Sequence, residues 1–265
     1  MSCYFDIETF KQYFNIENIK IPIIAGPCSA ESRNQMISIA GELSKTSNVF
    51  AFRCGLWKPR TRPGGFQGVG EKAFPWIKEI KEIYNLKVCV EVATPSHVEM
   101  CLKENIDFFW IGARTTGNPF SIDELCEALK GVNIPIMIKN PLSPDLQLWI
   151  GAIERLYNAG CQKVIGVHRG YSLLNNDIYR NHPYWQNLID FKEQFDSIPL
   201  LCDPSHIAGN RDLIFEISQK AIYYGVQGLM IEVHSEPEHA LTDKFQQITP
   251  LKLRELIRKL SIQNG

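Results

Sequence analysis

Eight short runs rich in β-branched and aromatic residues alternate with segments of helical periodicity along the whole chain. The runs start 21 to 38 residues apart, which is the length of one strand–helix unit. The predicted strands are residues 21–26, 49–55, 87–93, 108–113, 135–140, 163–170, 199–205 and 228–234. Eight such units in a row predict an α/β fold, a single (β/α)8 TIM barrel over residues 21–265. Residues 1–20 are predicted to form a short N-terminal extension.

The structural alternative is a doubly wound open sheet. Such a sheet normally has fewer strands and carries a glycine-rich dinucleotide turn after the first of them. Here the first predicted strand is followed by GPCSAES, which lacks the GxGxxG spacing. The barrel is therefore the preferred interpretation.

Composition excludes several classes of function. The net charge of −1 over 265 residues provides no field for nucleic acid or an acidic membrane surface. The first residues, MSCYFDIETFKQYF, are polar and acidic, unlike a signal peptide, and no apolar run approaches the ~20 residues of a membrane span. None of the eight cysteines forms a CxxC pair, so we expect reduced, buried thiols in a cytoplasmic protein.

Chemically capable residues cluster at the carboxyl ends of the predicted strands. They are Cys28, Arg53, Glu91, Arg114, Lys139, Arg169, Asp203, His206, Glu232 and His234. One charged strand terminus would be unremarkable, but buried strands rarely carry so many charges. Because the carboxyl ends of barrel strands meet at one face, we expect these side chains to form a single site.

Four of the residues near these ends form a candidate metal site. Cys28, His206, Glu232 and Asp243 offer one thiolate, one imidazole and two carboxylates. This mixed set suits Mn²⁺, Fe²⁺, Co²⁺ or Zn²⁺. Structural zinc prefers closed sets of cysteine and histidine, so we expect a divalent metal that acts as a Lewis acid.

A second group of residues is cationic. Lys58 and Arg60 lie in a long loop, KPRTRPGGFQGVGEK, which alone could be a solvated basic loop. Arg114, Lys139 and Arg169 each follow an apolar strand and would be buried cations without partners unless a ligand or the acidic residues compensate them. Two phosphate subsites, or a phosphate and a carboxylate, would account for so many cations.

The motifs together closely resemble those of the 3-deoxy-D-arabino-heptulosonate 7-phosphate (DAHP) synthases. The resemblance covers about residues 20–250 and is carried by GPCSAES, RCGLWKPRTRPGGFQGVGEK, IGARTT, IKNP, HRG, DPSHIAGNRDL and MIEVHSEPEHALTD. It is most similar to the bacterial subgroup that is often fused to a C-terminal chorismate mutase. The resemblance implies a metal-dependent, aldol-type condensation of phosphoenolpyruvate with erythrose 4-phosphate, the first step of the shikimate pathway.

The resemblance also implies a role for each matching residue. The metal ligands would be Cys28, His206, Glu232 and Asp243. The phosphoenolpyruvate contacts would be Arg53, Lys58, Arg114, Lys139 and Arg169, with Glu91 nearby. Arg60 and Thr61 would bind the aldose phosphate, with Asp203 near the sugar hydroxyls. The expected catalytic residues are Lys58 as general acid, together with Cys28 and His206.

Two alternatives stay open. The related 3-deoxy-octulosonate 8-phosphate synthases share the barrel and the reaction type, but they typically carry KANR where this chain has KPRT. A catalytically inactive barrel that serves as a docking subunit should have lost a ligand or a phosphate-binding arginine, and none is missing. We further expect a homo-oligomer. The barrel units account for residues 21–260, so we expect control by aromatic amino acids to be absent and any regulation to come through a chorismate mutase domain or partner.

Overall fold

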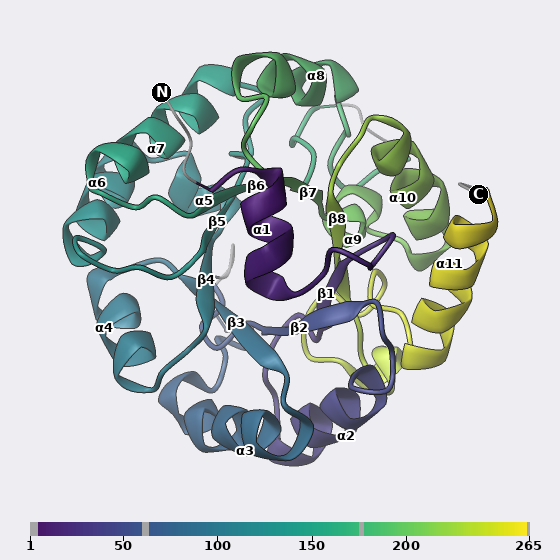
Figure 1. Ribbon diagram of the computed structural model, residues 1–265. Helices are drawn as coiled ribbons and strands as arrows, with labels where there is room; N and C mark the ends of the chain where they lie inside the picture. The colour runs from purple at the N-terminus through teal and green to yellow at the C-terminus, as the bar shows by residue number, and fades with distance from the viewer. Residues whose placement is uncertain (1–4, 60–63, 175–177, 264–265) are drawn as a thin grey trace.

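The computed structural model describes residues 5–59, 64–174 and 178–263. Its centre is a closed barrel of eight parallel strands in sequence order, in which the first strand also pairs with the last (Figure 1). The strands are β1 (Ile23–Gly26), β2 (Val49–Cys54), β3 (Lys87–Val92), β4 (Phe108–Ile111), β5 (Ile136–Lys139), β6 (Val164–His168), β7 (Leu200–Cys202) and β8 (Gly228–Glu232). The predicted (β/α)8 fold is therefore confirmed, and each strand lies within its predicted range.

Helices surround the barrel in a ring (Figure 1). The outer helices are α2 (Arg33–Leu43), α3 (Phe74–Tyr84), α4 (Pro95–Lys103), α6 (Pro119–Ala128), α7 (Leu146–Asn158), α8 (Trp185–Gln194), α10 (Ile214–Tyr223) and α11 (Pro250–Gln263). Short helical turns lie in the connections that follow strands: α5 (Ala113–Thr116), α9 (Pro204–Ala208), η1 (Gly70–Ala73), η2 (Arg211–Leu213) and η3 (Pro237–His239). Side-chain caps begin several helices, for example Ser32 before α2 and Asp145 before α7.

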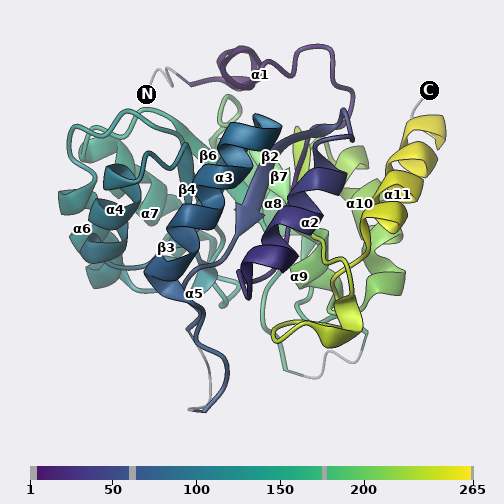
Figure 2. The same cartoon turned by 90° about the horizontal axis from the view of Figure 1, so that it is seen from below.

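The N-terminal segment covers the amino-terminal end of the barrel. Helix α1 (Ile7–Phe14) lies across that opening, on the side away from the long strand-to-helix loops (Figure 2). Its buried side chains, Phe10 and Phe14, join the cluster of apolar residues inside the barrel. Phe14 stacks edge-on against Phe108 at a centroid distance of 5.1 Å. The amphipathic spacing of FDIETFKQYF thus places its apolar face on the open end of the barrel core.

The barrel interior is apolar in its lower layers and charged in its top layer. Inward residues of five strands that belong to the apolar cluster are Ala51, Cys89, Met137, Leu201 and Met230. Two positions further along the chain, at or directly after the ends of the same strands, stand Arg53, Glu91, Lys139, Asp203 and Glu232. Because strand side chains alternate with a period of two, these charged residues face the same interior. The candidate site is therefore the uppermost layer of the barrel core.

The cysteines agree with the prediction of unpaired thiols. All seven that lie within the described residues, Cys28 among them, are buried and form no disulfide. Among the helices of the described chain, none is both long and apolar enough to cross a membrane.

Candidate functional site

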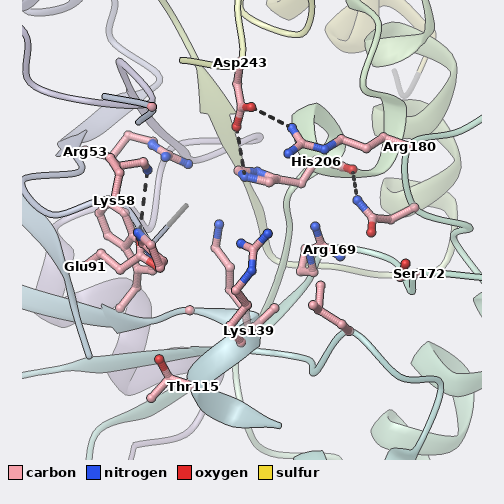
Figure 3. Close-up of a pocket in the computed structure, with 18 residues that line it drawn as sticks. Arg53, Lys58, Glu91, Thr115, Lys139, Arg169, Ser172, Arg180, His206 and Asp243 are labelled. Atoms are coloured by element: carbon pink, nitrogen blue, oxygen red, sulfur yellow. Dashed lines mark hydrogen bonds and ion pairs between the residues drawn. The ribbon is translucent and has the colours of Figure 1, made fainter. Parts of the chain in front are cut away.

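A cavity of about 590 Å³ opens at the carboxyl-terminal face of the barrel (Figure 3). The predicted residues that line it are Arg53, Lys58, Glu91, Arg114, Lys139, Arg169, His206 and Asp243. The predicted residues Cys28, Asp203 and Glu232 lie beneath this surface and are fully buried. Arg60 and Thr61 fall outside the described residues. The strand ends thus bring together the predicted cations and the predicted metal ligands.

The four candidate metal ligands converge on one point. Single ligand atoms of Cys28, Glu232 and Asp243 lie within 4.8 Å of one another, and Cys28 Sγ is 3.5 Å from Asp243 Oδ2. His206 Nε2 lies 3.8 Å from Glu232 Oε1 and 4.0 Å from Asp243 Oδ2. A group of sulfur, nitrogen and two carboxylate oxygens at these separations fits a divalent transition metal.

Asp203 fixes the orientation of His206. Its Oδ1 accepts a hydrogen bond from the backbone N–H of His206, as the N-cap of α9, and its Oδ2 lies 2.8 Å from the Nδ1 atom of the imidazole. The carboxylate thus lies beside Nδ1, although no hydrogen bond of standard geometry joins them, while Nε2 lies on the side of Glu232 and Asp243. A carboxylate behind a histidine is the usual second layer of a metal site.

Lys139 and Arg53 compensate the buried negative charge of Asp203. Lys139 Nζ donates to Asp203 Oδ2 at 2.7 Å, and Arg53 Nη1 lies 3.9 Å from the same oxygen. Arg53 also donates from Nη2 to Glu232 Oε1 at 3.0 Å. Both cations lie over the ring of Trp110, at 4.9 Å for Arg53 and 5.8 Å for Lys139. The indole thus forms an aromatic floor for these buried charges.

Lys58 reaches the site from the loop after β2. Its Nζ donates to the backbone carbonyl of Cys28 at 3.0 Å and lies 3.7 Å from Glu91 Oε2. Gly55 makes this approach possible, because a Cβ there would lie 2.6 Å from the Cys28 carbonyl oxygen and 2.8 Å from Lys58 Nζ. Gly112 does the same for Glu91, since a Cβ at Gly112 would lie 2.1 Å from Glu91 Oε1.

Burial and neighbouring charges set the protonation of the candidate metal ligands. Burial alone would raise the pKa of Asp243, but Arg180 and His206 outweigh it and lower that pKa to about 2. Burial lowers the pKa of His206 and therefore favours the neutral imidazole that a metal binds. Burial, reinforced by Glu232, raises the pKa of the Cys28 thiol, so a bound cation is needed to favour the thiolate.

The pKa values of two cations in the pocket, Arg169 and Lys58, are shifted in opposite directions. Burial lowers the pKa of Arg169 to about 10. Burial also opposes the charge on Lys58, but Cys28, Glu91 and Glu232 outweigh it and raise the pKa of the ammonium group. Both side chains are therefore protonated at neutral pH. The pocket is consequently cationic where it opens and acidic beneath.

The sequence prediction for Asp203 is untested, and two residues of the site were missed. The carboxylate of Asp203 is fully buried and faces Lys139 and His206, and its predicted contact with sugar hydroxyls stays a prediction. Sequence reasoning missed Arg180, which lines the pocket from the segment after β6, because this residue does not follow a strand directly. Gln246, whose amide touches Glu232 at 2.7 Å, was missed because it is uncharged.

The fold and the site together define an α/β-barrel enzyme whose active face combines a cation-lined pocket with a transition-metal ligand set. Comparison with known proteins narrows this class. The chain belongs to the DAHP synthetase I family, whose profile matches residues 7–263. The family resemblance of the motifs is thus confirmed, whereas membership of the subgroup fused to chorismate mutase stays a prediction.

Individual relatives agree with the family. The chain is 33% identical to the phospho-2-dehydro-3-deoxyheptonate aldolase of Thermotoga maritima over 245 residues, which cover 92% of this chain and 70% of that protein. The crystal structure of the Thermotoga maritima DAHP synthase superimposes with a TM-score of 0.82 at 31% identity, over 92% of this chain and 69% of that one. A 2-dehydro-3-deoxyphosphooctonate aldolase from Desulfotalea psychrophila is 27% identical over 90% of this chain and 88% of its own length.

Proposed function

We propose that this enzyme is a 3-deoxy-7-phosphoheptulonate synthase that condenses phosphoenolpyruvate with erythrose 4-phosphate and releases phosphate. The observation that carries the proposal is the juxtaposition of a candidate metal ligand set, Cys28, Glu232 and Asp243 with His206 beside them, with a pocket lined by several fixed cations. A phosphorylated carboxylate and a phosphorylated aldehyde need this combination. The cations bind the anionic groups, and the acidic layer beneath holds the metal.

The phosphoenolpyruvate would bind to the cations on the floor and wall of the pocket. Arg53, Lys139 and Arg169 are at most 5% exposed, yet all three line the cavity. Within the described chain, the Nε and Nη1 atoms of Arg53 have no hydrogen-bond partner. Buried donors of this kind normally find an acceptor, and a carboxylate or phosphate group supplies one. Arg114, in α5, also lines the pocket and would contribute a further charge.

The reaction forms one carbon–carbon bond and one carbon–oxygen bond to water at C2, and it breaks the carbon–oxygen bond between C2 and the phosphate. C3 of phosphoenolpyruvate attacks the aldehyde carbon, water adds to C2, and the resulting phospho-hemiketal releases phosphate. A divalent metal held by Cys28, His206, Glu232 and Asp243 would supply a Lewis acid for the aldehyde oxygen. Lys58 would give a proton to that oxygen; its protonated state and its contact with the backbone of Cys28 support this role.

The four-carbon acceptor is favoured over arabinose 5-phosphate by two observations. The loop after β2 carries KPRT, whereas the octulosonate synthases typically carry KANR at this place. The Thermotoga maritima heptonate aldolase is also more similar, at 33% identity, than the Desulfotalea psychrophila octonate aldolase, at 27%. We therefore propose that Arg60 and Thr61 bind the phosphate of erythrose 4-phosphate.

The decisive experiment measures phosphate release from phosphoenolpyruvate with each acceptor in parallel. We expect release with erythrose 4-phosphate, its loss after chelation, and its recovery when Mn²⁺ or Co²⁺ is added back. Release with arabinose 5-phosphate alone would assign the octulosonate reaction instead. Full activity in the metal-stripped protein would refute the Lewis-acid role.

We also propose that the protein works as a homo-oligomer in the cytoplasm and that a chorismate mutase is its regulatory domain or partner. The similarity of the motifs to the fused subgroup supports this proposal. Sedimentation analysis with and without a chorismate mutase would test the association. Inhibition by prephenate in the presence of the mutase, without inhibition by phenylalanine, tyrosine or tryptophan, is the expected pattern.

A further inference from the structure

A charged side chain outside the predicted site reaches one of the candidate metal ligands. Arg180 lies in the segment between β6 and α8, and its Nη1 atom is 3.0 Å from Asp243 Oδ1 (Figure 3). The other oxygen of that carboxylate, Oδ2, faces Cys28 Sγ at 3.5 Å and His206 Nε2 at 4.0 Å. Arg180 therefore binds the outer oxygen of Asp243 and leaves the inner oxygen directed at the ligand group.

The guanidinium group of Arg180 also orients a second candidate ligand, Glu232, through the side chain of Gln246. Arg180 Nη1 donates to Gln246 Oε1 at 2.6 Å, and Gln246 Nε2 donates to Glu232 Oε2 at 2.7 Å. An arginine can only donate and a carboxylate can only accept, so the buried amide of Gln246 has one possible orientation. This relay binds Oε2 of Glu232, while Oε1, which also accepts a hydrogen bond from Arg53 Nη2 at 3.0 Å, lies 3.8 Å from His206 Nε2.

Arg180 is itself held by the turn that carries His206. Its backbone N–H donates to the carbonyl of Ala208 at 3.2 Å, and the side chain of the next residue, Asn181, donates to the carbonyl of His206 at 2.7 Å. The side-chain stem also packs against Gly209, where an added Cβ would lie 2.4 Å from Arg180 Cβ. The position of the guanidinium is thus tied to the element that presents the imidazole.

Asp243 needs a neighbouring side chain to orient its carboxylate because it lies in a loop. Unlike Glu232, it lies in a loop after η3, and its backbone is in the left-handed region with φ of 48°. A carboxylate on a loop has no strand alternation to direct it.

We propose that Arg180 is a positioning residue for the metal site, one that orients Asp243 directly and Glu232 through Gln246. The inference rests on the metal-dependent function proposed above. It assigns Arg180 to the ligands rather than to a substrate phosphate, although the side chain also lines the pocket. Partners of this kind typically change metal affinity by 10–100-fold when removed.

The test measures Mn²⁺ binding to the substrate-free protein by the electron paramagnetic resonance signal of free Mn²⁺. Arg180→Met should weaken binding by about 10–100-fold. Arg180→Lys keeps the charge but replaces the planar guanidinium with a single ammonium group, so it should recover only part of the affinity. Gln246→Leu should also weaken binding, and the double variant should lose less than the sum of the single losses, because both act through one network.

Two matched variants serve as controls. Arg155→Met removes an exposed ion pair with Asp123 between α6 and α7 and should leave Mn²⁺ binding unchanged. Arg211→Met removes a contact that supports the loop carrying Asp243. Arg211 donates to the carbonyl of Lys244 at 2.6 Å and contacts none of the candidate metal ligands. We expect Arg211→Met to weaken binding much less than Arg180→Met. An equal effect would show that loop stability is responsible and would overturn the assignment.

The remaining outcomes separate the inference from the proposed function. If Arg180→Met binds Mn²⁺ like the wild type but has a raised KM for a phosphorylated substrate, Arg180 is a substrate ligand and the inference is wrong. If the wild-type protein binds no divalent metal, the proposed function fails first. Thermal unfolding of each variant confirms that it is folded, and Arg180→Lys keeps the test informative if Arg180→Met does not fold.

Discussion

The buried carboxylate of Asp203 offers the sharpest test of how the site is held together. Its Oδ2 lies 2.7 Å from Lys139 Nζ, 2.8 Å from His206 Nδ1 and 3.9 Å from Arg53 Nη1, and its side chain has no exposure. Asp203→Asn keeps the shape but removes the charge. Lys139 and Arg53 then lose part of their compensation, and an amide placed with its NH2 group at the Oδ2 position would face the ammonium group of Lys139 donor to donor.

The expected loss of stability is large. Removing one partner of a buried ion pair costs about 3–5 kcal/mol, because the remaining charge is left uncompensated. For a chain of this size that loss corresponds to a decrease of roughly 10 °C in Tm. Because Asp203 also fixes His206, Mn²⁺ affinity should fall by about 10–100-fold.

Urea-induced unfolding followed by tryptophan fluorescence measures the free energy of unfolding. Asp123→Asn is the matched control, because it breaks an ion pair with Arg155 whose two side chains are 59% and 41% exposed, and it should cost less than about 1 kcal/mol. Adding Lys139→Met to Asp203→Asn removes an uncompensated cation, so the double variant should be more stable than Asp203→Asn alone. A loss below 1 kcal/mol for Asp203→Asn would refute this account of the charged layer.

Three further predictions concern the loops and the core. Gly55→Ala should lower kcat by about 100-fold in steady-state assays, because the added Cβ displaces Lys58 from Cys28; an unchanged kcat would contradict the placement of Lys58. Burial lowers the pKa of His168 from 6.5 to about 3, so the unfolded state takes up a proton first as pH falls below 6.5. The free energy of unfolding should then drop by about 2 kcal/mol between pH 6.5 and pH 5, and His168→Gln should remove this part of the pH dependence in urea titrations. Arg60→Ala should raise KM for the aldose phosphate about 100-fold and leave KM for phosphoenolpyruvate nearly unchanged; equal increases would show that the cations are divided wrongly.

The sequence was sufficient to predict the barrel and most of the pocket because both follow from one periodicity. Strand alternation puts Glu91, Lys139 and Glu232 in the same layer, and the parallel topology brings their strand ends together. The alternation within each strand and the repeat of strand–helix units can both be read from short segments of sequence. Neither requires knowledge of how distant loops pack.

The missing parts of the site depend on loop conformation. Arg180 and Asp243 are 63 positions apart along the chain and meet only because two loops after β6 and β8 fold over the same face. The burial of Asp203 could not be read from DPSH, because the same motif can present its aspartate to solvent or, as here, use it as an N-cap. Periodicity directs the side chains of strands but not those of such loops.

The contacts of the cations indicate which of them are left for a ligand. Arg53 and Lys139 each approach a buried carboxylate, so a large part of their charge is used within the protein. Arg169 donates to the backbone carbonyl of Gly170, and among the described residues no carboxylate lies within 4.0 Å of its guanidinium. Its pKa is accordingly lowered to about 10, with burial as the main cause. An oxyanion bound beside Arg169 would offset the unfavourable burial of its charge. An oxyanion beside Lys139 would instead compete with Asp203 for the ammonium group. The strongest substrate contact should therefore be made by the cation that the protein itself compensates least.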